Sequence, residues 1–232
     1  MISRYDSQFN KIENLKWLPW FGDSYETIEM DRRLLIVGES HYHDNAPKSI
    51  EDHNSPTFTR VVIRELAMKQ NYRGIKIFPN LHRALLGSDE IDSGAFYNLV
   101  SFYNFIQRPM ETRKERPSRD DFSNAWSAFF EVVKVLKPKL CLFLGTTAAN
   151  TLGNAINKGS DYSTNVIVWE DKIGNARPKS TTIKGSDGNE TLIIFIRHTS
   201  QMFSWRKWHD YLQNKIGPEL VWLAEQVTRS KS

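Results

Sequence analysis

The chain has 232 residues, of which 40% are hydrophobic and 25% are charged, as is usual for a soluble globular protein. Its longest apolar runs, such as Leu192–Ile196, are far too short to span a bilayer, and the N-terminus has no apolar signal core. A single cysteine, Cys141, excludes an internal disulfide. We therefore expect a cytoplasmic protein that neither crosses nor binds a membrane.

The net charge is only +4, but the sequence pI of about 9.1 favours an anionic partner. The basic charge is concentrated in residues 108–119, RPMETRKERPSR, where cations outnumber acids. Such a stretch is either a solvated loop or a loop that contacts phosphates.

Strand and helix patterns alternate along the chain. Residues 33–39 read as a buried strand, and 57–72 as a partly buried helix, whereas 74–80 fits either a short strand or a turn. Ser118 or Asp121 can cap a helix that carries an apolar stripe and ends near Pro138. Further strands are predicted at 139–145, 166–171 and 191–200, with helices after 145 and over 206–217.

This alternation predicts one α/β domain over residues 1–232, with a helical and loop extension at 1–30 and a three-layer α/β/α core around a mainly parallel sheet. In such sheets ligands bind beyond the carboxyl ends of the strands. Polar clusters occupy three of these ends, at 38–43, 145–147 and 197–200. We expect them to converge on one site.

Two of the clusters contain residues suited to catalysis. Glu39 follows Gly38, which lets the backbone approach a ligand, and its carboxylate can activate water or stabilise a cation. The alternative is a helix cap or a buried ion pair. His198 emerges from the last buried strand, where a neutral imidazole can donate to an oxygen that gains charge. A purely structural histidine is the alternative there.

A metal site is a further possibility at the first strand end. His41, His43 and Asp44, with the more distant His53, could ligate a metal ion. The spacing matches no well-defined zinc motif, and no cysteine lies near.

Three short motifs resemble those of the uracil-DNA glycosylase superfamily. Residues 38–43, GESHYH, resemble the family's G-Q-D-P-Y-H motif, and their first three residues are closer to the G-E-A-P-G of another branch. Residues 198–203, HTSQMF, are similar to its H-P-S-P-L-S motif. Asn104 of SFYNF resembles the asparagine that ends a strand and reads the base. Residues 136–152 also look like the segment before the family's last strand.

The resemblance covers roughly residues 33–212, and it includes departures. Ser40 stands where one branch has a water-activating aspartate, so that role passes to Glu39. His41 and Thr199 replace prolines of the two motifs. Tyr42 corresponds to the tyrosine that excludes the thymine methyl group.

The resemblance implies a role for each matching residue. Glu39 would stabilise the cationic sugar and orient water, while His198 would stabilise the departing base anion. Met202 would be an apolar wedge in place of the family's leucine, with Phe203 beside it. Gly38, Ser40, Tyr42, Phe58 and Asn104 would form the base pocket, with Phe58 as the stacking ring, and Ser200, Arg108, Arg113, Lys114 and Arg116 would contact DNA. The resemblance implies no metal or organic cofactor, and we expect a monomer.

These features lead us to expect a monofunctional DNA glycosylase that leaves an abasic site. Its substrate would be uracil, a deaminated purine or a modified pyrimidine such as viruses carry, and its role either repair or antiviral defence. A catalytically silent nucleic-acid-binding protein of the same fold and a metal-dependent hydrolase are the alternatives. The sequence does not decide the base, the strandedness of the DNA or the pathway.

Overall fold

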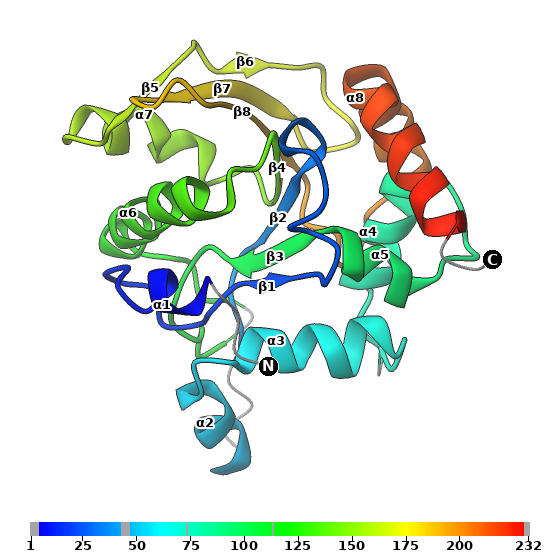
Figure 1. Cartoon of the computed structure of the whole chain (residues 1–232), viewed down its shortest axis with the longest axis horizontal. Helices are drawn as coiled ribbons and strands as arrows, with labels where there is room; N and C mark the ends of the chain where they lie inside the picture. The colour runs from blue at the N-terminus through cyan, green and yellow to red at the C-terminus, as the bar shows by residue number, and fades with distance from the viewer. Residues whose placement is uncertain (1–4, 43–46, 73, 113, 230–232) are drawn as a thin grey trace.

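A computed structural model describes residues 5–42, 47–72, 74–112 and 114–229 (Figure 1). Its centre is an eight-stranded sheet in the order β1-β3-β2-β4-β8-β7-β5, with β6 also paired to β7. The strands are β1 (Trp20–Phe21), β2 (Leu34–Gly38), β3 (Ser101–Asn104), β4 (Leu140–Leu144), β5 (Tyr162–Thr164), β6 (Val168–Trp169), β7 (Lys179–Gly185) and β8 (Glu190–Ile196).

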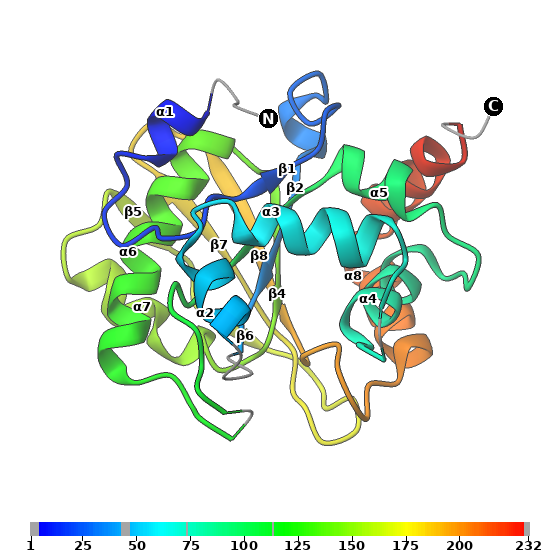
Figure 2. The ribbon, with the colours of Figure 1, turned by 90° about the horizontal axis from the view of Figure 1, so that it is seen from below.

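Helices cover both faces of this sheet (Figures 1 and 2). They are α1 (Asp6–Phe9), α2 (Pro47–Asn54), α3 (Phe58–Val62), α4 (Ile77–Leu86), α5 (Ser93–Leu99), α6 (Arg119–Leu136), α7 (Ala149–Asn157) and α8 (Trp205–Arg229), with a π-helical segment, Ile63–Met68, after α3 and a 3₁₀ turn at Met30–Arg32. Core residues of α4, α5 and α8 pack against one face, and those of α6 and α7 against the other. This arrangement is compatible with the predicted three-layer fold.

The prediction of a mainly parallel sheet is wrong, because the sheet is mixed. The central strands β3, β2, β4 and β8 run parallel to one another, and the strands at both edges of the sheet pair antiparallel. A tight turn with Gly188 at φ +82° joins β7 to β8, and so short a connection forces antiparallel pairing. The strand β7, KSTTIKG, escaped the prediction because it lacks an apolar run.

Most of the individual elements follow the sequence patterns. The strands at 33–39, 139–145 and 191–200 are confirmed as β2, β4 and β8, and the undecided segment 74–80 becomes the start of α4. Ser118 is the N-cap of α6: its hydroxyl accepts from the Asp121 amide, and the Asp121 carboxylate accepts from the Ser118 amide. The helix α8 continues beyond 217 across a non-helical residue, Ile216. Within the described ranges, no helix is long and apolar enough to cross a membrane.

Candidate functional site

The carboxyl ends of the four parallel strands, β3, β2, β4 and β8, lie side by side at one end of the sheet. Gly38 pairs with Asn104 on one side of β2, and Leu144 of β4 pairs with Ile196 of β8. The segments that carry Glu39, Gly145 and His198 therefore leave the sheet at the same end, where the parallel strands terminate, which is the lower end in Figure 2. The three polar clusters therefore lie at the same end of the sheet, as predicted, and their convergence on one site stays a prediction.

Glu39 is half-buried at this end of the sheet and lines a small cavity together with residues of β2, β4 and α6 and of the segment that follows β3. Its backbone carbonyl accepts a hydrogen bond from the Ile106 amide at 2.8 Å, which fixes the start of the loop. Within the described part of the chain, its carboxylate caps no helix and makes no hydrogen bond or ion pair. Both alternative explanations, the cap and the ion pair, are therefore absent there, and the carboxylate is available to a ligand.

His198 lies within electrostatic reach of Glu39. Burial lowers the pKa of His198 below its ordinary value, and the negative charge of Glu39 opposes this shift. The imidazole is therefore neutral at physiological pH and can donate one N–H to a ligand. The two side chains form no direct ion pair, so they can act on different parts of one ligand.

Asn104 is buried at the end of β3, and its side chain is held by the loop after β2. Its Nδ2 lies 2.8 Å from His41 Nε2, and Thr59 Oγ1 lies 3.1 Å from the same nitrogen. Burial, with a smaller contribution from His53, lowers the pKa of His41 to about 3. The imidazole is therefore neutral, and its unprotonated nitrogen can accept the Asn104 amide.

Gly38 is required by the packing around Asn104. A Cβ at this position would collide with Asn104 Oδ1 and would lie 2.9 Å from the ring of Phe102. The glycine thus lets the asparagine side chain lie over the end of β2.

The two aromatic candidates, Phe58 and Tyr42, are both half-buried. The ring of Phe58 packs at 4.5 Å from His41 and 4.6 Å from His53, in a cluster completed by Trp17. Tyr42 packs against the core on the α6 side of the sheet. Phe58 therefore belongs to the group that surrounds His41, directly beside Asn104.

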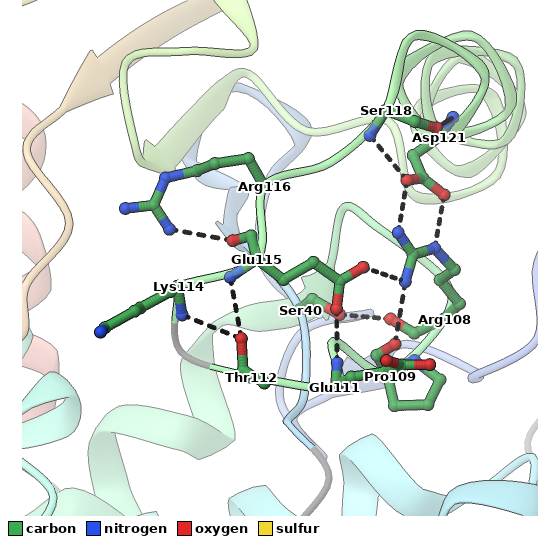
Figure 3. Close-up of polar contacts among 10 residues, drawn as sticks. All are labelled: Ser40, Arg108, Pro109, Glu111, Thr112, Lys114, Glu115, Arg116, Ser118 and Asp121. Carbon is green, nitrogen blue, oxygen red and sulfur yellow. Dashed lines mark hydrogen bonds and ion pairs between the residues drawn. The ribbon is translucent and has the colours of Figure 1, made fainter.

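Arg108 holds the basic loop in place (Figure 3). Its guanidinium donates to both carboxylate oxygens of Asp121 at 2.7 Å and pairs with Glu115 at 2.7 Å. The carbonyl of Arg108 accepts a hydrogen bond from the Ser40 hydroxyl at 2.5 Å. The hydrogen bonds from Arg108 lower the pKa of Asp121 to about 2. Arg108, predicted as a DNA contact, thus anchors the loop, and Ser40 ties that loop to the strand end.

The other cations of the loop point elsewhere. Lys114 and Arg116 are exposed, and their side chains extend away from the Arg108 cluster (Figure 3). The Arg116 guanidinium donates to the Glu115 carbonyl at 2.9 Å. Arg113 lies outside the described residues.

The loop after β8 presents Met202 to solvent. Met202 is 84% exposed and has a left-handed backbone, φ +57°, which is unusual for a residue with a side chain. Phe203 is buried instead and stacks on Trp208, so the expectation that it shares an exposed wedge is wrong. Asn80 of α4 donates to the carbonyls of Thr199 and Ser200 at 2.9 and 3.0 Å. Ser200 is thus held through its backbone.

Three positioning residues escaped the sequence analysis. Asn80 and Thr59 lie on helices whose patterns carry no functional signal, and Gln107 donates through its side chain to the Asn104 carbonyl. The partners of Asn80 and Thr59 are distant in sequence, so only the tertiary packing reveals them, whereas Gln107 contacts a residue three positions away.

Two cavities border the strand ends. The cavity beside Glu39 measures about 30 Å³ and is closed by Phe105, Pro117, Phe122 and Phe143. A larger groove of about 410 Å³ lies between the N-terminal segment and α6, and Arg108 is its one predicted site residue. The smaller cavity is lined by Gly38 and Glu39, whereas the other predicted catalytic and base-pocket residues, Ser40, Tyr42, Phe58, Asn104 and His198, do not line it.

The metal hypothesis receives no support from the described residues. Among them, no group of three or more His, Cys, Asp or Glu side chains is arranged to hold a metal ion. His43 and Asp44 lie outside those ranges.

No known protein family matches the chain, and no curated protein matches its sequence.

Proposed function

We propose that this protein is a DNA glycosylase that hydrolyses the N-glycosidic bond of an aberrant or modified base and leaves an abasic site. The observation that carries the proposal is the pair of Glu39 and His198. A half-buried carboxylate with no partner in the described part of the chain lies within electrostatic reach of a neutral imidazole.

The pair matches the charges that develop in this reaction. When the bond between sugar C1′ and the base nitrogen breaks, its electrons leave with the base, and the sugar becomes an oxocarbenium-like cation. Glu39 stabilises this cation and takes a proton from the attacking water, whose oxygen bonds to C1′. His198 donates a hydrogen bond to the base oxygen that gains negative charge.

The neighbouring surface suits the extrusion of a nucleotide from DNA. Unstacking a base costs on the order of a few kcal/mol, which an apolar wedge and phosphate contacts can offset. Met202 is apolar and 84% exposed, as such a wedge must be. Lys114 and Arg116 are exposed and supply the phosphate contacts, whereas Arg108 keeps their loop in place.

Asn104 supports a nucleobase as the ligand. An amide both donates and accepts, as the edge of a base requires; Gly38 lies directly beside Asn104, and Phe58 packs on His41, which contacts the Asn104 amide. The motifs shared with uracil-DNA glycosylases agree with these positions. We propose uracil or a modified pyrimidine as the substrate, in repair or in defence against phage with modified DNA, with no metal or organic cofactor required.

The decisive experiment measures base release in the presence of EDTA from DNA that contains uracil or natural phage modifications. Alkali-labile abasic sites should appear, and Glu39→Gln and His198→Ala should each slow their formation at least about a hundredfold. Glu225→Gln, at an exposed position of α8, is the matched control and should keep full activity. Full activity of Glu39→Gln would contradict the proposal.

One observation favours a second candidate, a silent nucleic-acid-binding protein. The cavity beside Glu39 is far smaller than the roughly 300 Å³ at which ligand pockets usually begin, so a base enters only if the surrounding loops separate. If the protein binds DNA but releases no base from any substrate of the panel, this candidate replaces the glycosylase.

A further inference from the structure

An exposed tryptophan lies on the edge of the sheet, outside the site described above. Trp169 of β6 is 58% exposed, although tryptophan side chains are usually largely buried. It lies in a short apolar stretch with the exposed residues Val166 and Val168. Nothing in the proposed chemistry requires these side chains.

The indole ring rests on a buried cation. Lys179 of β7 is only 5% exposed, and its Nζ lies 4.2 Å from the centroid of the Trp169 ring. The same nitrogen donates to the Thr146 carbonyl at 3.1 Å and to Asn150 Oδ1 at 2.6 Å. No carboxylate of the described residues forms an ion pair with it. One face of the indole is therefore fixed, and the ring remains open to solvent.

Trp169 belongs to the row of the sheet that leads to the candidate site. Trp169 pairs with Lys179, Lys179 with Phe195, and Phe195 with Phe143 next to β2. Adjacent strands lie roughly 4.8 Å apart, which places Trp169 about 10 Å along the row from β8, the strand that leads to His198. That distance corresponds to roughly three nucleotides of a DNA strand, and the roughly 19 Å from Trp169 to β2, the strand that leads to Glu39, corresponds to roughly six.

The loop between β6 and β7 carries two exposed cations and two acidic residues, and Lys215 of α8 adds one more cation beside it. Lys172 and Arg177 are exposed there. Of the two acidic residues, Glu170 is paired with Lys215 at 2.6 Å, and Asp171 is exposed. The charge around the ring thus favours a phosphate backbone.

We infer that Trp169, supported by Lys179, is a stacking platform for an unpaired base of the DNA strand, a few nucleotides from the one that reacts. The inference rests on the proposed function and deepens it, because a platform for an unstacked base selects single-stranded DNA or DNA opened beside the site. Stacking on an aromatic ring is tolerant of sequence and is a main source of affinity for single strands. The fixed indole needs no reordering before a base stacks on it.

The test measures binding, by fluorescence anisotropy, of labelled single-stranded and duplex oligonucleotides without modified bases. Trp169→Ala should weaken single-strand binding about tenfold or more, the loss expected from one stack, and should change duplex binding much less. Trp169→Phe should restore most of the affinity. Val166→Ala, in the same apolar stretch, is the control and should bind like the wild type, and thermal melts should show that all variants fold.

Equal single-strand binding by Trp169→Ala and the wild type would overturn the inference, as would a wild type that binds no DNA. A wild-type dimer that Trp169→Ala converts to a monomer, with unchanged DNA affinity, would assign the surface to a second copy of the chain instead. Base release distinguishes the two proposals. If binding depends on Trp169 but no base is released, the stacking platform stands and the glycosylase proposal fails. If bases are released but Trp169→Ala binds DNA like the wild type, the glycosylase proposal stands and the platform fails.

Discussion

His41 Nε2 lies 2.8 Å from Asn104 Nδ2, so the loop after β2 holds the residue that ends β3. The contact joins two neighbouring strand ends through their side chains, in addition to the backbone pairing of Gly38 with Asn104. Because the imidazole is neutral, it can accept the amide proton and leave Oδ1 over Gly38. The direction in which Asn104 meets a ligand is thus set by a histidine.

Replacing His41 should loosen this asparagine. In His41→Ala the buried amide loses its partner, and a buried polar group without one costs about 1–3 kcal/mol. We expect base release to fall by about tenfold or more, chiefly in kcat, while binding of unmodified DNA stays close to wild type. Thr59→Val, which keeps the His41–Asn104 contact, should have a smaller effect. An unchanged rate for His41→Ala would show that Asn104 needs no support.

Gly38→Ala should displace the Asn104 side chain through its Oδ1 rather than its Nδ2. The new Cβ collides with Asn104 Oδ1 and crowds the Phe102 ring, and overpacking of this kind costs about 1–3 kcal/mol. Both the free energy of unfolding and the rate of base release should fall. Gly153→Ala is the control because no atom lies within 4 Å of a Cβ there. Urea unfolding and the base-release assay measure the two effects.

The catalytic candidates were accessible from the sequence because each follows a buried apolar strand at an abrupt polar boundary. Glu39 and His198 come directly after such runs, and parallel strands bring their ends together. The groups that position them were not accessible. Asn80 acts on backbone carbonyls about 120 residues away, and the role of Arg108 depends on two carboxylates that the folded loop brings to it.

The antiparallel strands at the edges of the sheet could not be predicted from the sequence patterns either. The strand β7, KSTTIKG, contains one large apolar residue, Ile183, and its burial depends on pairing with β8, so its own sequence resembles a loop. Lys179 illustrates the difficulty, because a lysine is normally read as exposed, yet here it lies beneath Trp169.

Stability should rise with pH through the acidic range. Burial lowers the pKa of both His41 and His82 to about 3, against about 6.5 in an unfolded chain. Between these values the unfolded state binds protons that the folded state does not, so each histidine contributes up to about 1.4 kcal/mol per pH unit, and the gain ends above about pH 6.5. Urea unfolding at several pH values measures this slope. His82→Gln should remove its own share of this slope, up to about 1.4 kcal/mol per pH unit, and an unchanged slope would contradict the assignment.

Variants of the basic loop should distinguish a residue that anchors the loop, Arg108, from one that contacts DNA, Lys114. Lys114→Ala removes an exposed cation, so DNA binding should weaken and the slope of log affinity against log salt should fall by about one, with the melting temperature unchanged. Arg108→Ala leaves Asp121 and Glu115 without their shared partner, so it should lower the melting temperature as well as DNA affinity. If Arg108→Ala changes only the salt slope, Arg108 contacts phosphate directly and is not the anchor.

Asp6 should be essential for attaching the N-terminal segment. Its carboxylate pairs with Arg60 of α3 at 2.6 and 3.1 Å, and both side chains are nearly buried. In Asp6→Ala the guanidinium keeps its bond to the Pro19 carbonyl but loses its counter-charge, and breaking a buried pair in this way costs about 3–5 kcal/mol. Glu65→Ala breaks the exposed pair with Lys69 and should cost less than about 1 kcal/mol. Urea unfolding compares the two variants, and equal losses would show that burial adds nothing to the Asp6–Arg60 pair.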